Sequence, residues 1–399
     1  MCDECTLKKR SNYTGHCCCT PLLDIRCEQL STIPEFSSDG PLTYSGIYMA
    51  DQRIAEIPDK VFQNLKVRKI MLNFNQIEDK LSSTAFKGLE KTVQELYLGD
   101  CKITSLPERM LEKMEEMKYV HLWQNQIKRI PPYFFRDCVN LRELILWGNQ
   151  IDKIDSHTFA GLSKLRKLDL DRNRIQTLSK DAFRHMRELE VLHIGENRIK
   201  LLQADSFVYI VNLKVLNLDG NIIDSVNGKA FAGLRSLVAL ALNGNKIRYF
   251  PTETFSNLTN LTSISLQNNA IESIWKSALQ TLHHLYKVDL SGNRLRKIDE
   301  DTFSMAQKLR YLYLERNDLN FLNRCMLSKK TNLRTLSLIG NNFHCDCRAS
   351  WLMEMHERDG VKIWGTCGSS KLVRVPTSIV SRFQYKANVC KNPPVECKL

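Results

Sequence analysis

The chain has 399 residues, of which 43% are hydrophobic, and 57 Lys and Arg against 44 Asp and Glu give a formal net charge of +13. This composition allows a large buried core, and the basic excess favours acidic or polyanionic partners without identifying them. No run approaches the roughly 18 consecutive apolar residues of a membrane-spanning helix, so we expect no membrane span in this chain.

Residues 1–41 are predicted to form a cysteine-rich amino-terminal cap. The chain has 14 cysteines, and most of them lie near its two ends. The amino-terminal cluster is Cys2, Cys5, Cys17, Cys18, Cys19 and Cys27. Terminal clusters of this kind indicate disulfide-bonded caps formed in an oxidising compartment, and three N-glycosylation sequons agree with that interpretation. The sequons begin at Asn12, Asn257 and Asn260.

The amino-terminal cysteines also allow a different interpretation. Zinc could bind to Cys2, Cys5, His16 and one of the cysteines at 17–19, because a CxxC followed by further Cys and His ligands has plausible spacing. We favour disulfides, since the sequons and the cysteines at the opposite end place the chain outside the cytosol. The predictions are therefore no metal and no cofactor.

The sequence start, MCDECTLKKR, lacks the apolar stretch of a signal peptide, and the end, PPVECKL, lacks the hydrophobic tail of a lipid-anchor signal. Together with the cysteines and sequons, this predicts an extracellular protein, either secreted or an ectodomain, whose signal peptide is absent from this sequence.

Residues 42–343 are predicted to form a repeat array. An asparagine recurs every 24 residues from Asn125 to Asn341, each preceded by L/V/I-x-x-L/V/I-x-L/I-x-x, and earlier units carry Cys101, Asn75 and Gln52 at this place. The pattern L-x-x-L-x-L-x-x-N/C-x-L is that of leucine-rich repeats. The predicted fold is an α/β leucine-rich repeat solenoid: a curved horseshoe with a parallel concave β-sheet of about 13 short strands and with irregular loops and turns on its convex side.

Each repeat position has a predicted physical role. In LRELILWGNQI, the core residues are Leu141, Leu144, Leu146 and Ile151, and Asn149 bonds backbone groups of adjacent coils. A buried thiol can replace asparagine at Cys101 as a weak donor. A second apolar row is predicted to stack as a spine under the convex side; its members are Phe135, Phe159, Phe183, Phe207, Phe231, Phe255 and Phe303, with Leu111, Leu279 and Leu327 as replacements.

Residues 344–399 are predicted to form a cysteine-rich carboxyl-terminal cap and tail. The stretch NNFHCDCRASWL, followed by Cys367 and Cys390, resembles the carboxyl cap of extracellular leucine-rich repeat proteins such as Slit, the Nogo receptor and Toll-like receptors. The resemblance implies disulfides from Cys345 to Cys367 and from Cys347 to Cys390, with Trp351 packed over the last coil.

The run Cys17-Cys18-Cys19 with Cys27 and LSTIP resembles the matching amino cap, although the triple cysteine departs from its pattern and leaves the pairing among Cys17, Cys19 and Cys27 open. Of the three cysteines in the middle of the chain, Cys325 occupies a place that other repeats fill with polar residues, and we pair it with Cys397. Cys101 and Cys138 then remain buried thiols.

Two tryptophans on neighbouring strands define the main predicted ligand-binding surface. Because side chains alternate along a strand, Ile145 and Trp147 point away from the core, onto the concave face. Trp123 lies one repeat earlier, and strands about 4.8 Å apart place the two indoles in contact. The predicted patch, aromatic with a carboxylate border, is Tyr97, Tyr119, His121, Trp123, Ile145, Trp147, Asp169, Asp171 and His193.

Contiguous exposed aromatic residues rimmed by charge are typical of protein interfaces. The alternative is that the rings stack only to stabilise the solenoid. Tyr313 and Glu315 form a smaller second candidate patch.

Basic residues recur at the second position of the repeat motif, directly after its first leucine, and are expected to form a row. A solvated face is the simpler interpretation, and binding of a sulfated glycosaminoglycan is the sharper one, although Glu190 interrupts the row. The candidate glycan-binding residues are Arg68, Lys118, Arg142 and Arg166, and the row continues at Lys214, Arg310 and Arg334.

The sequence contains no GxSxG, HExxH, Walker or GxGxxG motif. Asp169, Asp171 and His193 could meet on the concave face, but a shallow open sheet does not easily exclude water or shift a pKa. We therefore expect a binding protein without catalytic residues, and not an enzyme.

The predicted function is recognition of a protein ligand on the concave face, in adhesion, signalling or innate immune recognition. One alternative is a structural matrix protein that resembles the small leucine-rich proteoglycans and binds collagen or a sulfated glycosaminoglycan. Another is a non-catalytic accessory subunit of a secreted enzyme. Nucleic acid is not expected as a partner, because the sensing arrays of Toll-like receptors are much longer, and the sequence does not define an oligomeric state.

Overall fold

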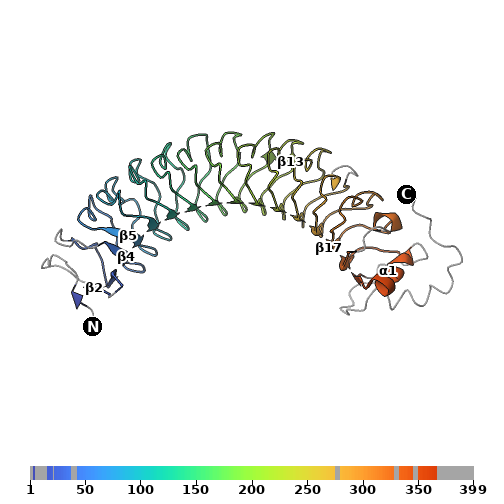
Figure 1. The fold of residues 1–399 in the computed structure, drawn as a ribbon, viewed down its shortest axis with the longest axis horizontal. Coiled ribbons are helices and arrows are strands. Elements are labelled where there is room, and N and C mark those ends of the chain that lie inside the picture. Colours follow the sequence, from blue (N-terminus) through green and yellow to red (C-terminus); the bar gives the residue numbers. More distant parts are fainter. Residues whose placement is uncertain are drawn as a thin grey trace. The chain divides into compact units, whose positions relative to one another are not determined.

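A computed structural model describes residues 3–4, 16–20, 22–36, 43–274, 279–327, 332–344 and 349–365. The chain divides into two compact units, Met1–Arg198, which we call the first unit, and Ile199–Leu399, the second unit. Both are stacks of coils in which a short strand is followed by turns (Figure 1).

The first unit contains a sheet that begins antiparallel and continues parallel. β2 pairs antiparallel with β1 and β3, and from β3 to β10 each strand pairs parallel with the next. The register advances by one repeat per strand, so that Tyr97 lies beside His121 and His121 beside Ile145. The strands are β1 (Asp3–Glu4), β2 (His16–Cys19), β3 (Asp24–Glu28), β4 (Tyr44–Tyr48), β5 (Val67–Met71), β6 (Glu95–Tyr97), β7 (Tyr119–His121), β8 (Glu143–Ile145), β9 (Lys167–Asp169) and β10 (Val191–His193).

The second unit has a parallel sheet in which β12 pairs with β14 and each strand from β14 to β19 pairs with the next. A separate two-stranded parallel pair joins β11 and β13. Its helical elements are the 3₁₀ helix η2 (Arg324–Met326) and the helix α1 (Trp351–Asp359). The strands are β11 (Leu201–Leu202), β12 (Val215–Asn217), β13 (Ser225–Val226), β14 (Ala239–Ala241), β15 (Ser263–Ser265), β16 (Lys287–Asp289), β17 (Tyr311–Tyr313), β18 (Thr335–Ser337) and β19 (Lys362–Trp364). The predicted leucine-rich repeat solenoid with a parallel sheet is thus confirmed within each unit.

The core is shared between neighbouring coils. The predicted core residues Leu141, Leu144, Leu146 and Ile151 are all fully buried. The phenylalanine spine is also confirmed: Phe207 and Phe231 stack with ring centroids 6.1 Å apart, and Phe231 and Phe255 follow at 6.2 Å. The spine extends further toward the amino terminus than predicted, through Phe36, Phe62 and Phe86.

Asparagine side chains join the coils to each other. Asn149 Nδ2 donates to the carbonyls of Leu122 (2.8 Å) and Leu146 (2.9 Å), and its Oδ1 accepts from the Ile127 N–H (3.1 Å). The Leu122 carbonyl also accepts from Asn125, so successive asparagines share acceptors and form a continuous ladder. At Cys101 the thiol donates to the Leu72 carbonyl, as expected of a weak donor, and burial raises the pKa of this thiol to about 12.

Cysteine chemistry in the described residues agrees with a disulfide-bonded amino-terminal cap. Cys17 is bonded to Cys27, while Cys18, Cys19 and Cys325 are also disulfide-bonded. The alternative zinc site is therefore wrong, because Cys17, Cys18 and Cys19 all lack a thiolate to offer. Cys101 and Cys138 are buried free thiols, as predicted. Predictions for Asn12, Cys345, Cys347, Cys367, Cys390 and Cys397 lie outside the described residues.

Among the described residues, no helix combines the length and the apolar character required to cross a bilayer. In the carboxyl-terminal region Trp351, at the start of α1, is buried, as its predicted packing requires.

Asn149→Ala is expected to lower the free energy of unfolding by on the order of 2 kcal/mol, because it leaves the buried Ile127 N–H without its acceptor and removes two donors. Urea denaturation followed by circular dichroism measures this loss. Gln126→Ala is the control and should change stability little, because the Gln126 side chain is exposed although its neighbours Asn125 and Ile127 are buried in the ladder. Equal effects of the two substitutions would contradict the structural role of the ladder.

Candidate functional site

The open face of the first unit is the side of its sheet that faces away from the leucine core. If the first leucine of the motif is position 1, the open face carries the side chains at positions 3, 5, 7 and 8. Along the sheet, side chains at one position form a column with one member per coil. The fixed parallel register of β5 to β10 places these members beside each other.

Aromatic side chains and one arginine from positions 7 and 8 lie next to each other on the open face. The indoles of Trp123 and Trp147 stack with centroids 5.9 Å apart and planes inclined by 6°. Phe74 meets Trp123 edge-on at 5.4 Å, and the Arg172 guanidinium lies 6.0 Å from the centre of the Trp147 ring. We call Phe74, Trp123, Trp147 and Arg172 the aromatic column. The predicted contact between the two tryptophans is confirmed.

Trp123 can lie flat because the residue one coil earlier is a glycine. A Cβ atom added to Gly99 would overlap the Trp123 indole ring. The backbone of Gly99 is itself held in place, since its N–H donates to the buried Asn73 side chain at 2.7 Å. The indole therefore covers Gly99 and has a defined support on each side.

Two members of the aromatic column, Phe74 and Arg172, are absent from the sequence prediction. Both lie at position 8, where the chain turns after the strand, and both have positive φ, 62° for Phe74 and 55° for Arg172. A bulky residue in this left-handed region is unfavourable, and Phe74 is nevertheless 49% exposed. The sequence signal that could have found them is the occupation of this turn position by Phe and Arg where several other repeats have glycine.

A second column, at position 5, combines Tyr97 and His121. Their rings meet edge-on at 4.6 Å, and His121 Nε2 lies 3.2 Å from a Glu143 carboxylate oxygen. Ile145, predicted to be an exposed member of the patch, is only 6% exposed. It points to the predicted side of the sheet, but larger neighbours leave little of it accessible. The expectation of an exposed Ile145 is therefore corrected.

Charged groups of position 3 connect these rings. Lys69 lies 4.8 Å from the Tyr97 ring centre and 3.3 Å from Glu95, which accepts the Tyr97 hydroxyl at 2.8 Å. Burial, followed by the Glu95 hydrogen bond, raises the pKa of Tyr97 above its ordinary value, so the phenol stays neutral. Tyr119 is half-buried beside them.

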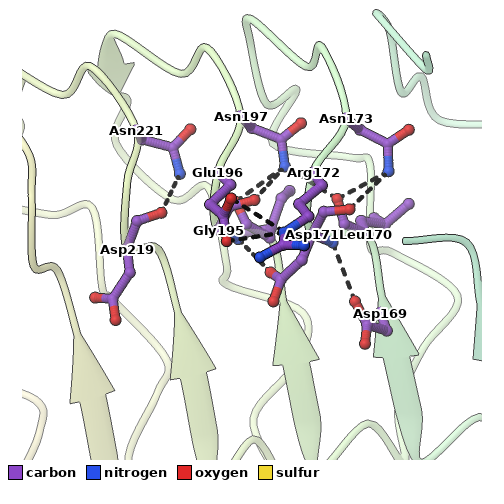
Figure 2. A network of polar contacts seen from close by, with 11 residues as sticks. Asp169, Leu170, Asp171, Arg172, Asn173, Gly195, Glu196, Asn197, Asp219 and Asn221 are labelled. Carbon is purple, nitrogen blue, oxygen red and sulfur yellow. Dashed lines mark hydrogen bonds and ion pairs between the residues drawn. The ribbon is translucent and has the colours of Figure 1, made fainter. Parts of the chain in front are cut away.

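The predicted carboxylate border also assembles. One ligand atom each from Asp169, Asp171 and His193 lies within 4.8 Å of the others. His193 Nδ1 is 3.8 Å from an Asp169 oxygen. The Asp171 carboxylate accepts the Gly195 N–H of the next coil (Figure 2). Beside them Arg172 pairs with Glu196 at 3.1 Å (Figure 2).

The two histidines of the open face have opposite pKa shifts. The hydrogen bond with Asp169 raises the pKa of His193, whereas burial lowers the pKa of His121 despite the nearby Glu143. Burial, with the neighbouring charge of Asp169, raises the pKa of Asp171. The three border residues are spaced so that a cation could lie between them.

The remaining predicted residues lie apart from the aromatic column. In the basic row, Arg166 pairs with Glu188 at 3.6 Å and Lys118 donates to the Gln94 side chain at 2.9 Å, while Arg68 and Arg142 are exposed. In the second unit, the sequon residues Asn257 and Asn260 are partly and fully exposed, respectively. Also there, Lys287 lies 5.5 Å from the Tyr313 ring centre, and Glu315 accepts the Ser337 hydroxyl.

Comparison with known proteins gives matches at the level of family and fold. The leucine rich repeat family model matches residues 91–151, 139–199, 187–247, 240–295 and 283–343, together more than half of the chain. No curated protein matches the chain.

Solved structures with a similar fold include a TLR13–ssRNA13 complex, with 26% identity and a TM-score of 0.74, covering 81% of this chain and 47% of that chain. A chain of an octameric Latrophilin 3, Unc5D and FLRT2 complex has 21% identity and a TM-score of 0.62. The match covers 91% of this chain and 96% of that chain. A chain of a Drosophila Toll–Spatzle complex has 20% identity and a TM-score of 0.67. The match covers 84% of this chain and 54% of that chain. The chain spans about half the length of the TLR13 chain that it matches.

Gly99→Ala is expected to displace the Trp123 indole and so to weaken the circular dichroism signal that arises from coupling of the two stacked indoles. Gly228→Ala is the matched control, because a Cβ at that position meets its nearest neighbour at an ordinary 3.4 Å. If the signal survives in Gly99→Ala, the indole does not depend on that glycine.

His193 is expected to titrate above the ordinary histidine value of 6.5 and His121 below it, as measured by NMR of the imidazole protons. Because folding raises the pKa of His193, its contribution to stability is fully present below the unfolded pKa and is lost as pH rises through the folded pKa. Asp169→Asn should lower the pKa of His193 and reduce the melting temperature more at about pH 5 than at pH 8. A His193 pKa unaffected by Asp169→Asn would contradict the pairing.

Proposed function

The chain belongs to the leucine-rich repeat family, and on that premise we propose that it is an extracellular recognition protein that binds a protein partner on the open face of its first unit. The aromatic column carries this proposal. Stacked indoles, a half-exposed phenylalanine and an arginine on one face are the residue types that dominate binding energy at protein interfaces.

The rigidity of the column supports the same role. Trp123 is held between Gly99, Phe74 and Trp147, so few rotamers remain to be lost when a partner covers it. A preorganised aromatic surface binds more tightly because less conformational entropy is lost on association. Phe74, which is 49% exposed on this face, adds an apolar surface for a partner to cover.

The border residues predict the charge of the partner. Asp169 and Asp171 lie beside the aromatic column, and the single arginine of the column, Arg172, is already paired with Glu196. A partner with apolar side chains at the centre of its interface and basic groups toward this border would be complementary.

Proteins of similar fold support recognition as the general role. The Toll chain is found with Spatzle, and the FLRT2 repeat chain is found in a complex with Latrophilin 3 and Unc5D. TLR13 is found with single-stranded RNA, which makes RNA a competitor to include in binding experiments. These likenesses show the fold, and the ligand of this chain is inferred from its own open face.

The compartment and the absence of catalysis are part of the proposal. Disulfides at Cys17, Cys18, Cys19, Cys27 and Cys325 fit an oxidising, extracellular environment. Asn260, the first residue of a sequon, is exposed, and its side-chain amide donates to the Arg235 carbonyl at 2.9 Å. The open face of a sheet does not easily exclude water, so binding without chemistry is the role that we propose for it.

Trp123→Ala with Trp147→Ala is expected to weaken partner binding by on the order of 100-fold, because buried tryptophans at interface centres each contribute about 2 kcal/mol or more. The partner is first found by screening the secreted chain against purified extracellular proteins, and affinities are then measured by surface plasmon resonance. RNA is included as a competitor.

Tyr249→Ala is the matched control, since Tyr249 is an exposed aromatic residue of the second unit and lies outside the aromatic column. It should bind like the unmodified chain. A double tryptophan variant that melts at a lower temperature and binds unchanged would assign the indoles a purely structural role and would refute the proposal.

A further inference from the structure

A polar hollow of about 570 Å³ lies at one edge of the sheet in the second unit, next to β17, β18 and the turn between α1 and β19. Figure 1 labels β17 and α1, which lie next to the hollow, in the carboxyl-terminal part of the ribbon. We call it the basic hollow. Its charged and polar lining comprises Arg310, Asn332, Arg334, Thr335, Asp359 and Lys362.

Three cations lie in the basic hollow on consecutive coils. The Arg334 N–H donates to the Arg310 carbonyl, and the Lys362 N–H donates to the Arg334 carbonyl, both at 2.8 Å. Each coil thus contributes one basic residue, and the coils repeat at about 4.8 Å. Arg310 and Arg334 share one motif position, whereas Lys362 is in register with Thr335, the residue after Arg334. Three cations on consecutive coils match a linear ligand that carries several negative charges.

Across the described part of the chain, no ion pair includes Arg310, Arg334 or Lys362. Asp359 is the one carboxylate in the lining, and it is bonded to Arg358 by two hydrogen bonds of 2.9 and 3.1 Å. By contrast Arg166, at the same motif position in the first unit, is paired with Glu188.

An aromatic pair supports one side of the hollow. The Arg310 guanidinium lies 5.3 Å from the ring centre of the exposed Tyr286, and that ring contacts Tyr311 at 5.2 Å. Stacking on an aromatic ring fixes the guanidinium without reducing its charge. The Tyr286 ring also provides an exposed flat surface beside the cations.

We propose that the basic hollow binds a sulfated glycan chain, with sulfate groups contacting Arg310, Arg334 and Lys362. The proposal is independent of the open face, which belongs to the first unit. A linear polyanion fits three cations on consecutive coils, and the hydrogen-bonding groups of Asn332 and Thr335 suit the hydroxyl groups of a sugar. The disulfides place the chain in an oxidising compartment, where sulfated glycans are the abundant polyanions.

The test uses the full chain and immobilised heparin. Arg334→Glu with Lys362→Glu should weaken binding by on the order of 100-fold, because each charge-assisted contact is worth roughly tenfold in affinity. The matched control is Lys246→Glu with Arg248→Glu, which changes the net charge equally at two exposed positions outside the hollow. Both pairs lie on the surface, so both variants should melt like the unmodified chain.

Three results would overturn the proposal. The first is equal weakening by the two double variants, which would assign heparin binding to net charge alone. The second is undiminished competition by desulfated heparin, which would remove the role of sulfate. The third is a single-stranded RNA homopolymer that competes better than heparin and loses its binding in Arg334→Glu with Lys362→Glu, which would assign the hollow to nucleic acid.

Discussion

The structure depends on the inability of any one coil to bury its own apolar residues. A coil has only a few inward leucines and one spine residue, so its core exists only between two neighbours. The asparagine ladder fixes this stacking, because each side chain bonds backbone groups of its own coil and of the coil before it. The ladder tolerates extra residues outside the strand, because Cys101 lies 26 residues after Asn75 and its thiol still donates to the Leu72 carbonyl of the coil before.

The same period determines where function can arise. Outward side chains at one motif position must lie about 4.8 Å from their counterparts in adjacent coils, so they form columns whether or not evolution uses them. In the first unit, Trp123 and Trp147 stack because they occupy the same motif position in adjacent coils and because Gly99 leaves room for the indole. In the second unit, Arg310 and Arg334 form a row by the same register. One scaffold thus presents an apolar surface and a cationic surface in different coils.

Features that repeat could be predicted from the sequence, and features that depend on a single neighbour could not. The leucines, the asparagine ladder, the buried Cys101 and Cys138 and the contact of Trp123 with Trp147 all follow from periodicity. Phe74 and Arg172 were missed because they lie at a turn position that strand alternation does not describe. The exposure of Ile145 was overestimated, because alternation gives the side of the sheet and says nothing of how far larger neighbours cover a side chain. The basic hollow needed the placement of the turn after α1, which no period specifies.

The proposed binding mode requires that the aromatic column becomes buried when the protein binds its partner. Hydroxyl-radical footprinting of the full chain, alone and in complex, measures this residue by residue through mass spectrometry. We predict that oxidation of Phe74, Trp123 and Trp147 falls in the complex while that of Tyr249, in the second unit, stays constant. Unchanged oxidation of both indoles in a saturated complex, with protection elsewhere on the chain, would contradict the account.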